Sequence, residues 1–172
     1  MKRMPQSIAT RLAGLLLRFA DEADAELILD MIRGLAEFER LSHEVVADSD
    51  TLRRFLFGRQ PAAEVLIAEY EGRPAGFALF FHNFSTFLGR PGIYLEDLFV
   101  KPEFRGKGIG REVLAFLAGL AVERGCGRLE WAVLDWNARA VDFYKRLGAR
   151  PMEDWTVFRL GGRDLKEFAR RA

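Results

Sequence analysis

Hydrophobic residues recur along the chain in two periods, one typical of helices and the other typical of strands. In the first period they return every three or four residues, which predicts a helix over residues 21–40 with Asp21 as its cap. The apolar positions of this helix are Leu27, Ile28, Met31, Ile32, Leu35 and Phe38. The same spacing predicts a second amphipathic helix, which starts after a loop at residues 101–110 and ends at Gly125.

Glycines mark the ends of two shorter helices. One is predicted over residues 50–57, before Gly58, and the other over residues 138–147, before Gly148. A polar helical tail is predicted from Asp164 onward.

Runs of apolar and aromatic residues predict the strands. Residues 65–70 and 77–84 lie on either side of a turn at 71–74 and predict an antiparallel hairpin. The other predicted strands cover residues 15–19, 92–100, 129–134 and 155–160. Because hairpins come first and strands alternate with helices afterwards, we expect an α/β (α+β) fold. Its central sheet should be mixed and mostly antiparallel, with helices on both faces.

Composition narrows the class of protein to a folded globular domain. The chain has 172 residues, of which 49% are hydrophobic and 30% are charged, and this length is typical of one domain. We expect residues 1–14 to form a mobile N-terminal extension and residues 15–172 to form a single domain. No apolar run approaches the ~18–20 residues of a membrane-spanning helix, so no membrane partner is expected.

Charge and cysteine content exclude further classes. The 26 lysines and arginines nearly cancel the 25 acids, and the net charge of +1 argues against bulk binding of nucleic acid. Cys126 has no second cysteine for a disulfide, and His43 and His82 lack metal-ligand spacing, so no metal site is expected. A reducing, cytoplasmic location follows as the expectation.

The loop before the second amphipathic helix carries the clearest chemical signal. Alternating glycines let backbone amides approach an anion, and the helix that starts there adds the positive end of its dipole. The glycines are Gly106, Gly108 and Gly110, and the neighbouring cations are Arg105, Lys107 and Arg111. The loop therefore predicts a phosphate or pyrophosphate cradle, with an ordinary glycine-rich turn as the alternative.

The spacing of this loop excludes two familiar phosphate-binding motifs. A dinucleotide fingerprint would need glycine where Arg111 or Val113 stands. A P-loop would need serine or threonine after Lys107, where the chain has Gly108. Neither a dinucleotide-binding fold nor a nucleotide hydrolase is therefore predicted.

Several motifs in order resemble one superfamily. Arg105-x-x-Gly108-x-Gly110, after the strand end Leu98-Phe99-Val100, resembles the acyl-CoA pyrophosphate motif of the GNAT N-acetyltransferases. Residues 129–149 resemble the second half of the CoA site in the diamine (spermidine/spermine) and thialysine N-acetyltransferase branch. Residues 32–39 and 94–97 extend the resemblance, which runs from about residue 16 to residue 160. It implies the GNAT acyl-CoA N-acyltransferase fold, acetyl-CoA as cosubstrate and a homodimer.

The resemblance also implies which residues hold acetyl-CoA. They are Leu98, Phe99, Val100, Arg105, Gly106, Lys107, Gly108, Ile109, Gly110, Arg111, Asn137, Ala140 and Tyr144. Asn137 precedes a predicted helix, so capping that helix is the alternative to contact with the pantetheine arm.

Tyr144 has two interpretations. Its place in a helix beside Phe143 is typical of a core aromatic residue. The resemblance instead implies a general acid, whose phenolic proton goes to the thiolate that leaves the thioester.

Glu96 and Asp97 are adjacent acids in an otherwise apolar strand, where burial of a carboxylate is costly. In a regular strand they point to opposite faces, unless a bulge redirects one of them. Both are interpreted either as structural hydrogen-bond acceptors or as parts of an amine site. The resemblance favours Glu96 as the group that binds the ammonium and removes its proton, directly or through water, with Asp97 as support.

The acceptor is expected to be a small amine. The resemblance places Phe38, Glu39, Trp131 and Trp155 on the acceptor side, although a residue of each kind more often serves only in packing or at the surface. Residues 84–90 lack the acid that diamine enzymes carry and resemble the Ser-Thr-aromatic loop of thialysine-type enzymes. We therefore expect acetyl transfer to a primary amine of a lysine-like amino acid or of a di- or polyamine. The alternatives are a protein lysine or N-terminal acetyltransferase and a non-catalytic acyl-CoA-binding protein.

Overall fold

The computed structural model describes residues 7–171. The chain divides into two units, Met1–Ala132 and Val133–Ala172. Among the described residues, the first unit contains a six-stranded sheet and three α-helices, and the second contains two α-helices.

Each strand of the sheet pairs with its neighbours in sequence, in the order β1-β2-β3-β4-β5-β6. All pairs are antiparallel except β5 and β6, which are parallel. The strands are β1 (Ile8–Ala9), β2 (Leu15–Phe19), β3 (Glu64–Tyr70), β4 (Arg73–Ser85), β5 (Arg90–Val100) and β6 (Leu129–Trp131). The mixed, mostly antiparallel sheet predicted from the sequence is confirmed.

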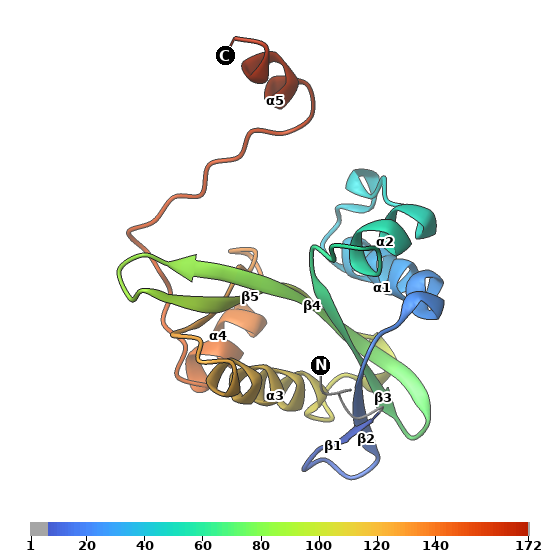
Figure 1. The fold of residues 1–172 in the computed structure, drawn as a ribbon. Coiled ribbons are helices and arrows are strands. Elements are labelled where there is room, and N and C mark those ends of the chain that lie inside the picture. Colours follow the sequence, from blue (N-terminus) through green and yellow to red (C-terminus); the bar gives the residue numbers. More distant parts are fainter. Residues whose placement is uncertain (1–6, 172) are drawn as a thin grey trace. The chain divides into compact units, whose positions relative to one another are not determined.

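Helices cover both faces of this sheet, as predicted (Figure 1). In the first unit, α1 (Ala25–Phe38) and α2 (Ser49–Leu56) lie on one face, and α3 (Ile109–Glu123) lies on the other. Phe19 of β2 contacts Phe116 of α3 edge to face, with ring centroids 6.3 Å apart. In the second unit, the helices are α4 (Ala138–Arg146) and α5 (Gly162–Ala169).

The predicted cap at Asp21 is present and is reinforced by an ion-pair clamp. Asp21 caps the short 3₁₀ turn Glu22–Asp24, and Asp24 accepts from the backbone amide of Asp21 at 2.9 Å. Arg18 of β2 holds both carboxylate oxygens of Asp24 at 2.6 and 2.8 Å and Glu69 of β3 at 2.8 Å. The hydrogen bonds from Arg18 lower the pKa of Asp24. The start of α1 is therefore fixed to two strands.

A Schellman turn ends α1. The amide of Leu41 donates to the carbonyl of Ala36 at 2.7 Å, and that of Arg40 donates to Glu37 at 3.1 Å. Arg40 has a φ of 62°, which is a left-handed conformation that usually selects glycine. The chain then enters a second 3₁₀ turn, Ser42–Glu44, and does not continue along the helix axis.

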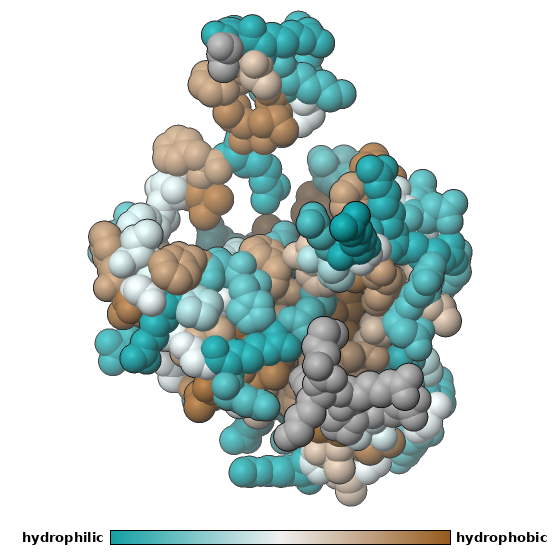
Figure 2. All heavy atoms as spheres, viewed as in Figure 1, coloured by the Kyte–Doolittle hydropathy of each residue, from teal (hydrophilic) through white to brown (hydrophobic). Residues whose placement is uncertain are grey.

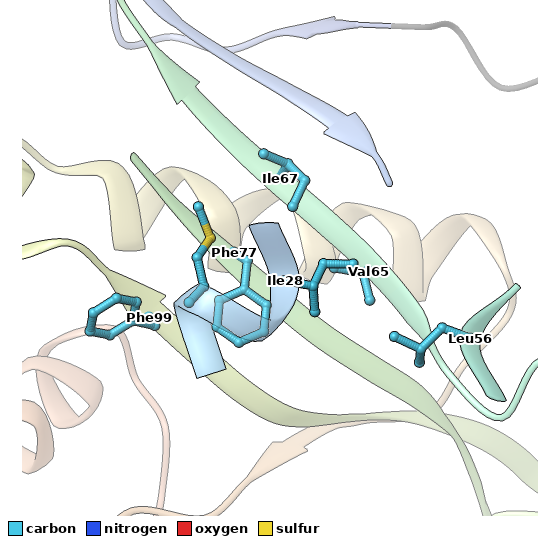
Figure 3. Packing of buried hydrophobic residues seen from close by; sticks show 7 residues of the cluster. Ile28, Leu56, Val65, Ile67, Phe77 and Phe99 are labelled. Carbon is cyan, nitrogen blue, oxygen red and sulfur yellow. The ribbon is translucent and has the colours of Figure 1, made fainter. Parts of the chain in front are cut away.

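The main hydrophobic cluster lies between α1, α2 and the sheet. Its buried members are Ile28, Met31, Leu56, Val65, Ile67, Phe77 and Phe99. Figure 3 shows Ile28 beside Phe77, with Phe99 at one end of the row and Leu56 at the other. Gly34 allows α1 to approach this cluster closely, because a Cβ there would lie 2.9 Å from the ring of Phe99.

The outer surface around α1 and α2 is mostly hydrophilic in the view of Figure 2. Arg53 of α2 pairs with Asp50 at 2.7 Å and with Glu26 of α1 at 3.5 Å. Across residues 7–171, no helix combines the length and the apolar character needed to cross a bilayer.

The N-terminal extension differs from its prediction where it is described. Ile8 and Ala9 form β1 and pair with Leu17 and Leu16 of β2, so these residues belong to the sheet. The amide of Arg11 also donates to Glu112 in the first turn of α3, at 3.2 Å. The predicted mobility of residues 1–6 lies outside the described residues.

Two predicted strands in the C-terminal third are shortened or absent. Residues 129–134 were predicted as one strand, but β6 ends at Trp131 because its pairing with β5 ends there. Residues 155–160 form no strand, so that prediction is wrong. A strand needs a partner for its backbone amides, and the described part of the second unit contains no other strand.

Phe77→Ala is expected to lower the free energy of unfolding by about 3–5 kcal/mol, because it leaves a cavity where a ring is 1% exposed. Phe87→Ala removes the same ring where it is 94% exposed, and a change within about 0.5 kcal/mol is expected. Urea titration of both variants measures the difference. Equal losses would contradict the assignment of Phe77 to the core.

Candidate active site

A β-bulge in β5 determines where the two adjacent acids point. Leu79 of β4 pairs with Asp97, whereas the next residue, Phe80, pairs with Leu95, so Glu96 is the extra residue. The alternation of faces therefore shifts by one position at Glu96. Asp97 lies on the face covered by α1, and Glu96 is solvent-exposed at the bulge.

Asp97 and Glu39 line one cavity of about 290 Å³. Glu39 is the C-cap of α1, and the segment after the Schellman turn adds Glu44 and much of the apolar wall. The main apolar lining residues are Ile32, Leu35, Ala36, Leu41, Val45 and Val46. The pocket therefore combines an aliphatic wall with carboxylates.

Burial makes these carboxylates reluctant to ionise. Burial, and to a smaller extent the charges of Glu96 and Glu39, together raise the pKa of Asp97 to about 6. Burial also raises the pKa of Glu39. Two acids in an apolar pocket repel each other when both are charged, and a bound cation would relieve that repulsion.

Arg105 connects the C-terminal end of α1 to the start of the glycine loop. Its guanidinium carbon lies 4.5 Å from the ring centre of Phe38 and 5.6 Å from that of Phe99. Its Nε donates to the carbonyl of Val100 at 2.9 Å. Arg105 therefore bridges α1 and the end of β5, whereas the sequence groups it with the loop cations Lys107 and Arg111.

The glycine loop has the backbone conformation of a cradle. Gly106 and Gly108 have φ values of 78° and 90°, and Gly108 caps α3. The first backbone hydrogen bond within α3 runs from the amide of Glu112 to the carbonyl of Gly108. The amides of residues 109–111 therefore have no carbonyl within the helix to donate to. A Cβ at Gly106, Gly108 or Gly110 would meet nothing within 4 Å, so the space above the loop is open.

The cations of the loop have different surroundings. Lys107 Nζ lies 5.5 Å from the ring centre of Tyr70 in β3. Arg111 is exposed in the first turn of α3, and Ile109 is 1% exposed and anchors that turn in the core. Of the three cations near the loop, Lys107 and Arg111 are therefore exposed, whereas Arg105 is half-buried.

The predicted strand end Leu98-Phe99-Val100 lies beyond the parallel pairing with β6. That pairing covers Ile93, Tyr94 and Leu95 of β5 only, and its last pair joins Leu95 to Trp131. Phe99 belongs to the hydrophobic cluster, so it offers a ligand its backbone and not its ring. The edge of β5 from Glu96 onward is left unpaired by β6.

The second unit carries the remaining predicted residues. Asn137 caps α4 and accepts from the amide of Ala140 at 3.2 Å, so the capping interpretation is confirmed. Tyr144 is half-buried in α4, with its ring centroid 5.4 Å from that of Phe143. Trp155 lies outside any helix or strand and is 70% exposed.

The family follows from comparison with known proteins. Residues 29–149 match the sequence pattern of the acetyltransferase (GNAT) family. The chain belongs to the GNAT acetyltransferase family. Its enzymatic class and fold, both inferred from the motifs, are thereby confirmed.

Relatives of this GNAT chain match it along nearly its whole length. The thialysine N-epsilon-acetyltransferase of Sus scrofa is 43% identical over 169 residues, which cover 92% of this chain and 99% of that protein. The L-ornithine N5-acetyltransferase NATA1 of Arabidopsis thaliana is 32% identical over 195 residues, which cover 87% and 86%.

Solved structures show the same GNAT fold. An integron cassette protein from the mobile metagenome of V. cholerae superposes with a TM-score of 0.77 at 25% identity, covering 91% of this chain and 98% of that one. An aminoglycoside acetyltransferase from an uncultured soil sample gives 0.73 at 20% identity, covering 87% and 97%.

The pocket contains features that the sequence did not reveal. Glu39 and Asp97 were predicted separately, and the structure brings them to one cavity. The wall formed by residues 41–47 was missed, because the turn that produces it has arginine where the usual signal is glycine. The adjacent acids were a signal of the bulge, because regular alternation would point them to opposite faces of the sheet and leave only one of them at the site.

Asp97→Asn is expected to stabilise the protein at pH 8. The folded-state pKa of about 6 lies above the ordinary value of 3.8, so the folded state favours the protonated acid. Stability is then greatest below pH ~4 and falls as the pH rises through about 6, by on the order of 2–3 kcal/mol. The amide variant lacks this loss.

Urea unfolding at pH 4.5, 6 and 8 measures this difference. Asp30→Asn is the matched control, because the Asp30 side chain is 72% exposed and its replacement should leave the pH profile unchanged. A less stable Asp97→Asn protein at pH 8 would contradict a half-buried Asp97 whose ionisation is unfavourable.

Proposed function

We propose that this GNAT acetyltransferase moves the acetyl group of acetyl-CoA to a primary amine of a small molecule. The amine attacks the thioester directly. The observation that carries the proposal is the cavity in which Glu39 and Asp97 meet an aliphatic wall. Such a site suits an alkyl chain that ends in an ammonium group, since the carboxylates balance its charge.

Glu96 is the proposed proton acceptor. An alkylammonium with a pKa near ~10.4 must lose a proton before it can attack. Asp97 and Glu39 would hold the ammonium, and Glu96 stands next to Asp97 at the bulge, where solvent reaches it. The proton therefore passes to Glu96 directly or through one water molecule.

The glycine loop is the proposed site of the pyrophosphate of acetyl-CoA, which would supply the thioester. Two observations support the fit: the open space above Gly106, Gly108 and Gly110, and the amides that precede the first helical bond of α3. Ile109 would anchor the first turn of α3, and the exposed side chains of Lys107 and Arg111 would add positive charge beside the pyrophosphate. Arg105 would act by holding α1 against β5. The backbone of residues 98–100 would bind the pantetheine arm.

Tyr144 is the proposed general acid, and Asn137 and Ala140 are proposed to contact the cosubstrate from α4. A phenol is a suitable proton donor for a departing thiolate. Trp131 and Trp155 are proposed to contribute to the acceptor side.

The names of the relatives favour an amino acid as acceptor. A thialysine and an ornithine acetyltransferase share most of their length with this chain, and both acceptors carry a terminal amine on an α-amino acid. We therefore propose a lysine-like amino acid as the acceptor, ahead of di- and polyamines.

Three further properties accompany this proposal. We expect residues 15–172 to act as one GNAT domain, the protein to form a homodimer, and its location to be cytoplasmic. No nucleic-acid or membrane partner is expected.

Thiol release over a panel of acceptors tests the function. The panel contains thialysine, lysine, ornithine, spermidine and an array of lysine-containing and free N-terminal peptides. Fastest turnover with the amino acids is expected. Turnover confined to peptides would establish the protein acetyltransferase instead, and acetyl-CoA binding without turnover on any acceptor would establish a binding protein.

Tyr144→Phe is expected to lower kcat by roughly 10²–10³-fold, because the proton donor is lost, while the Kd of acetyl-CoA stays within about two-fold. Steady-state kinetics and titration calorimetry measure the two quantities. Tyr70→Phe is the matched control, since it removes a hydroxyl and keeps the ring contacts with Phe104 and Lys107. Unchanged turnover in Tyr144→Phe would refute its role.

A further inference from the structure

A polar cluster joins β4, β5 and β6 at a distance from the carboxylate pocket. Glu130 of β6 accepts from Nδ2 of Asn83 at 2.9 Å, and its Oε2 lies 2.8 Å from Nε of Arg128. Gly92 of β5 makes room for this cluster, because a Cβ there would lie 2.5 Å from Asn83 Oδ1 and 2.9 Å from Arg128 Cγ. The cluster is therefore built around a position that excludes a side chain.

This cluster lies on the same face of the sheet as Asp97. Residues 77, 79, 81 and 83 of β4 share one face, and Phe77 places that face against α1. Asp97 pairs with Leu79, Tyr94 pairs with Phe81, and Glu130 pairs with Tyr94. The bulge at Glu96 is what brings Tyr94 and Asp97 to a common face.

An aromatic pair separates the two acidic sites. Phe81 and Tyr94 lie with ring centroids 5.4 Å apart, in the row between Asp97 and the cluster. Asp97 lies three residues after Tyr94 in β5, and Glu130 pairs with Tyr94 across one strand spacing. Together these two steps place the backbones of Glu130 and Asp97 roughly 11 Å apart. An extended lysine-like chain of roughly 6 Å, with hydrogen bonds of about 2.9 Å at each end, spans a comparable distance.

The Arg128–Glu130 pair keeps bonding capacity toward solvent. The two side chains are 35% and 33% exposed. Within residues 7–171, no hydrogen bond engages Oε1 of Glu130 or the Nη atoms of Arg128, and the buried Oδ1 of Asn83 has no hydrogen-bond partner. The pair thus offers two NH₂ groups of a guanidinium and a carboxylate oxygen side by side, which is the complement of an α-carboxylate and an α-ammonium.

We propose that Arg128 and Glu130 bind the head group of an α-amino acid acceptor whose terminal amine lies in the pocket of Glu39 and Asp97. Arg128 binds the α-carboxylate, Glu130 binds the α-ammonium, and the aliphatic chain lies over Phe81 and Tyr94. This subsite rests on the proposed acetyl transfer to a small amine, and it makes the zwitterionic head group the feature that selects the acceptor.

Four acceptors separate the two contacts. Thialysine carries both head-group charges, 3-(2-aminoethylthio)propanoic acid keeps only the carboxylate, and 2,2′-thiobis(ethylamine) keeps only the second ammonium. Finally, 2-(ethylthio)ethylamine keeps neither. All four present the same thioether and terminal amine, so the ratios of their kcat/KM values report the head group alone.

Each variant is expected to remove one preference. Arg128→Gln should lower kcat/KM about ten-fold or more for the two acceptors that carry a carboxylate and leave the other two within about two-fold. Glu130→Gln should do the same for the two acceptors with a second ammonium. Arg128→Lys, which keeps the charge, should recover part of the carboxylate preference.

Arg124→Gln is the matched control. Arg124 of the α3 C-terminus forms a comparable ion pair with Glu64, with side chains 25% and 35% exposed, away from this row of residues. Its loss should lower thermal stability without changing the order of the four acceptors. The KM for acetyl-CoA, measured in every variant, reports damage to β6 itself.

Three results would overturn the subsite. A wild-type enzyme that acetylates all four amines equally well would refute head-group recognition and leave the acetyltransferase function standing. An equal loss for all four acceptors in Arg128→Gln and Glu130→Gln would show that the pair only holds the strands together. A wild-type enzyme that acetylates none of the amines would refute the proposed function and the subsite with it.

Discussion

The extra residue at Glu96 in β5 is the constraint on which the candidate site depends. A strand without a bulge would place Tyr94 and Glu96 on one face and Asp97 on the other. The bulge shifts the alternation, so that Asp97 turns toward α1 and Glu39 while Leu95 stays in the core on the α3 side. The extra residue, Glu96, is exposed while its neighbour Asp97 is half-buried, and the two environments give adjacent acids different chemistry.

The pocket also illustrates how a site can oppose the stability of its own fold. An apolar wall makes ionisation of Asp97 unfavourable, and Glu39 adds repulsion. The clamp at the other end of α1 acts in the opposite sense, because Arg18 favours the charged form of Asp24. The N-terminal end of α1 is therefore fixed by paired charges, whereas Glu39 at its C-terminal end lines the same cavity as the carboxylate of Asp97. A cationic ligand gains the most beside such a pair of acids.

Much of this arrangement could be predicted from the sequence, for identifiable reasons. Helical periodicity and the Asp21 cap located α1, and alternating glycines located the loop before α3, because both depend on residues near one another in the chain. The Schellman turn at Arg40 could not be found, since its signal is usually glycine. The strand predicted at 155–160 failed because apolar content indicates a strand only where a partner exists, and pairing is not a local property. The meeting of Glu39 with Asp97 likewise depends on packing between distant segments.

The unpaired edge of β5 beyond Leu95 has a consequence for how such an enzyme changes over generations. Main-chain amides and carbonyls are the same whatever residue bears them, so a cosubstrate held by backbone at residues 98–100 and by the amides after Gly108 would tolerate many substitutions around it. The acceptor, by contrast, would meet side chains. Mutations would then alter which amine is accepted without weakening the binding of the acetyl donor. One fold would thus diversify its acceptors while its donor stayed the same.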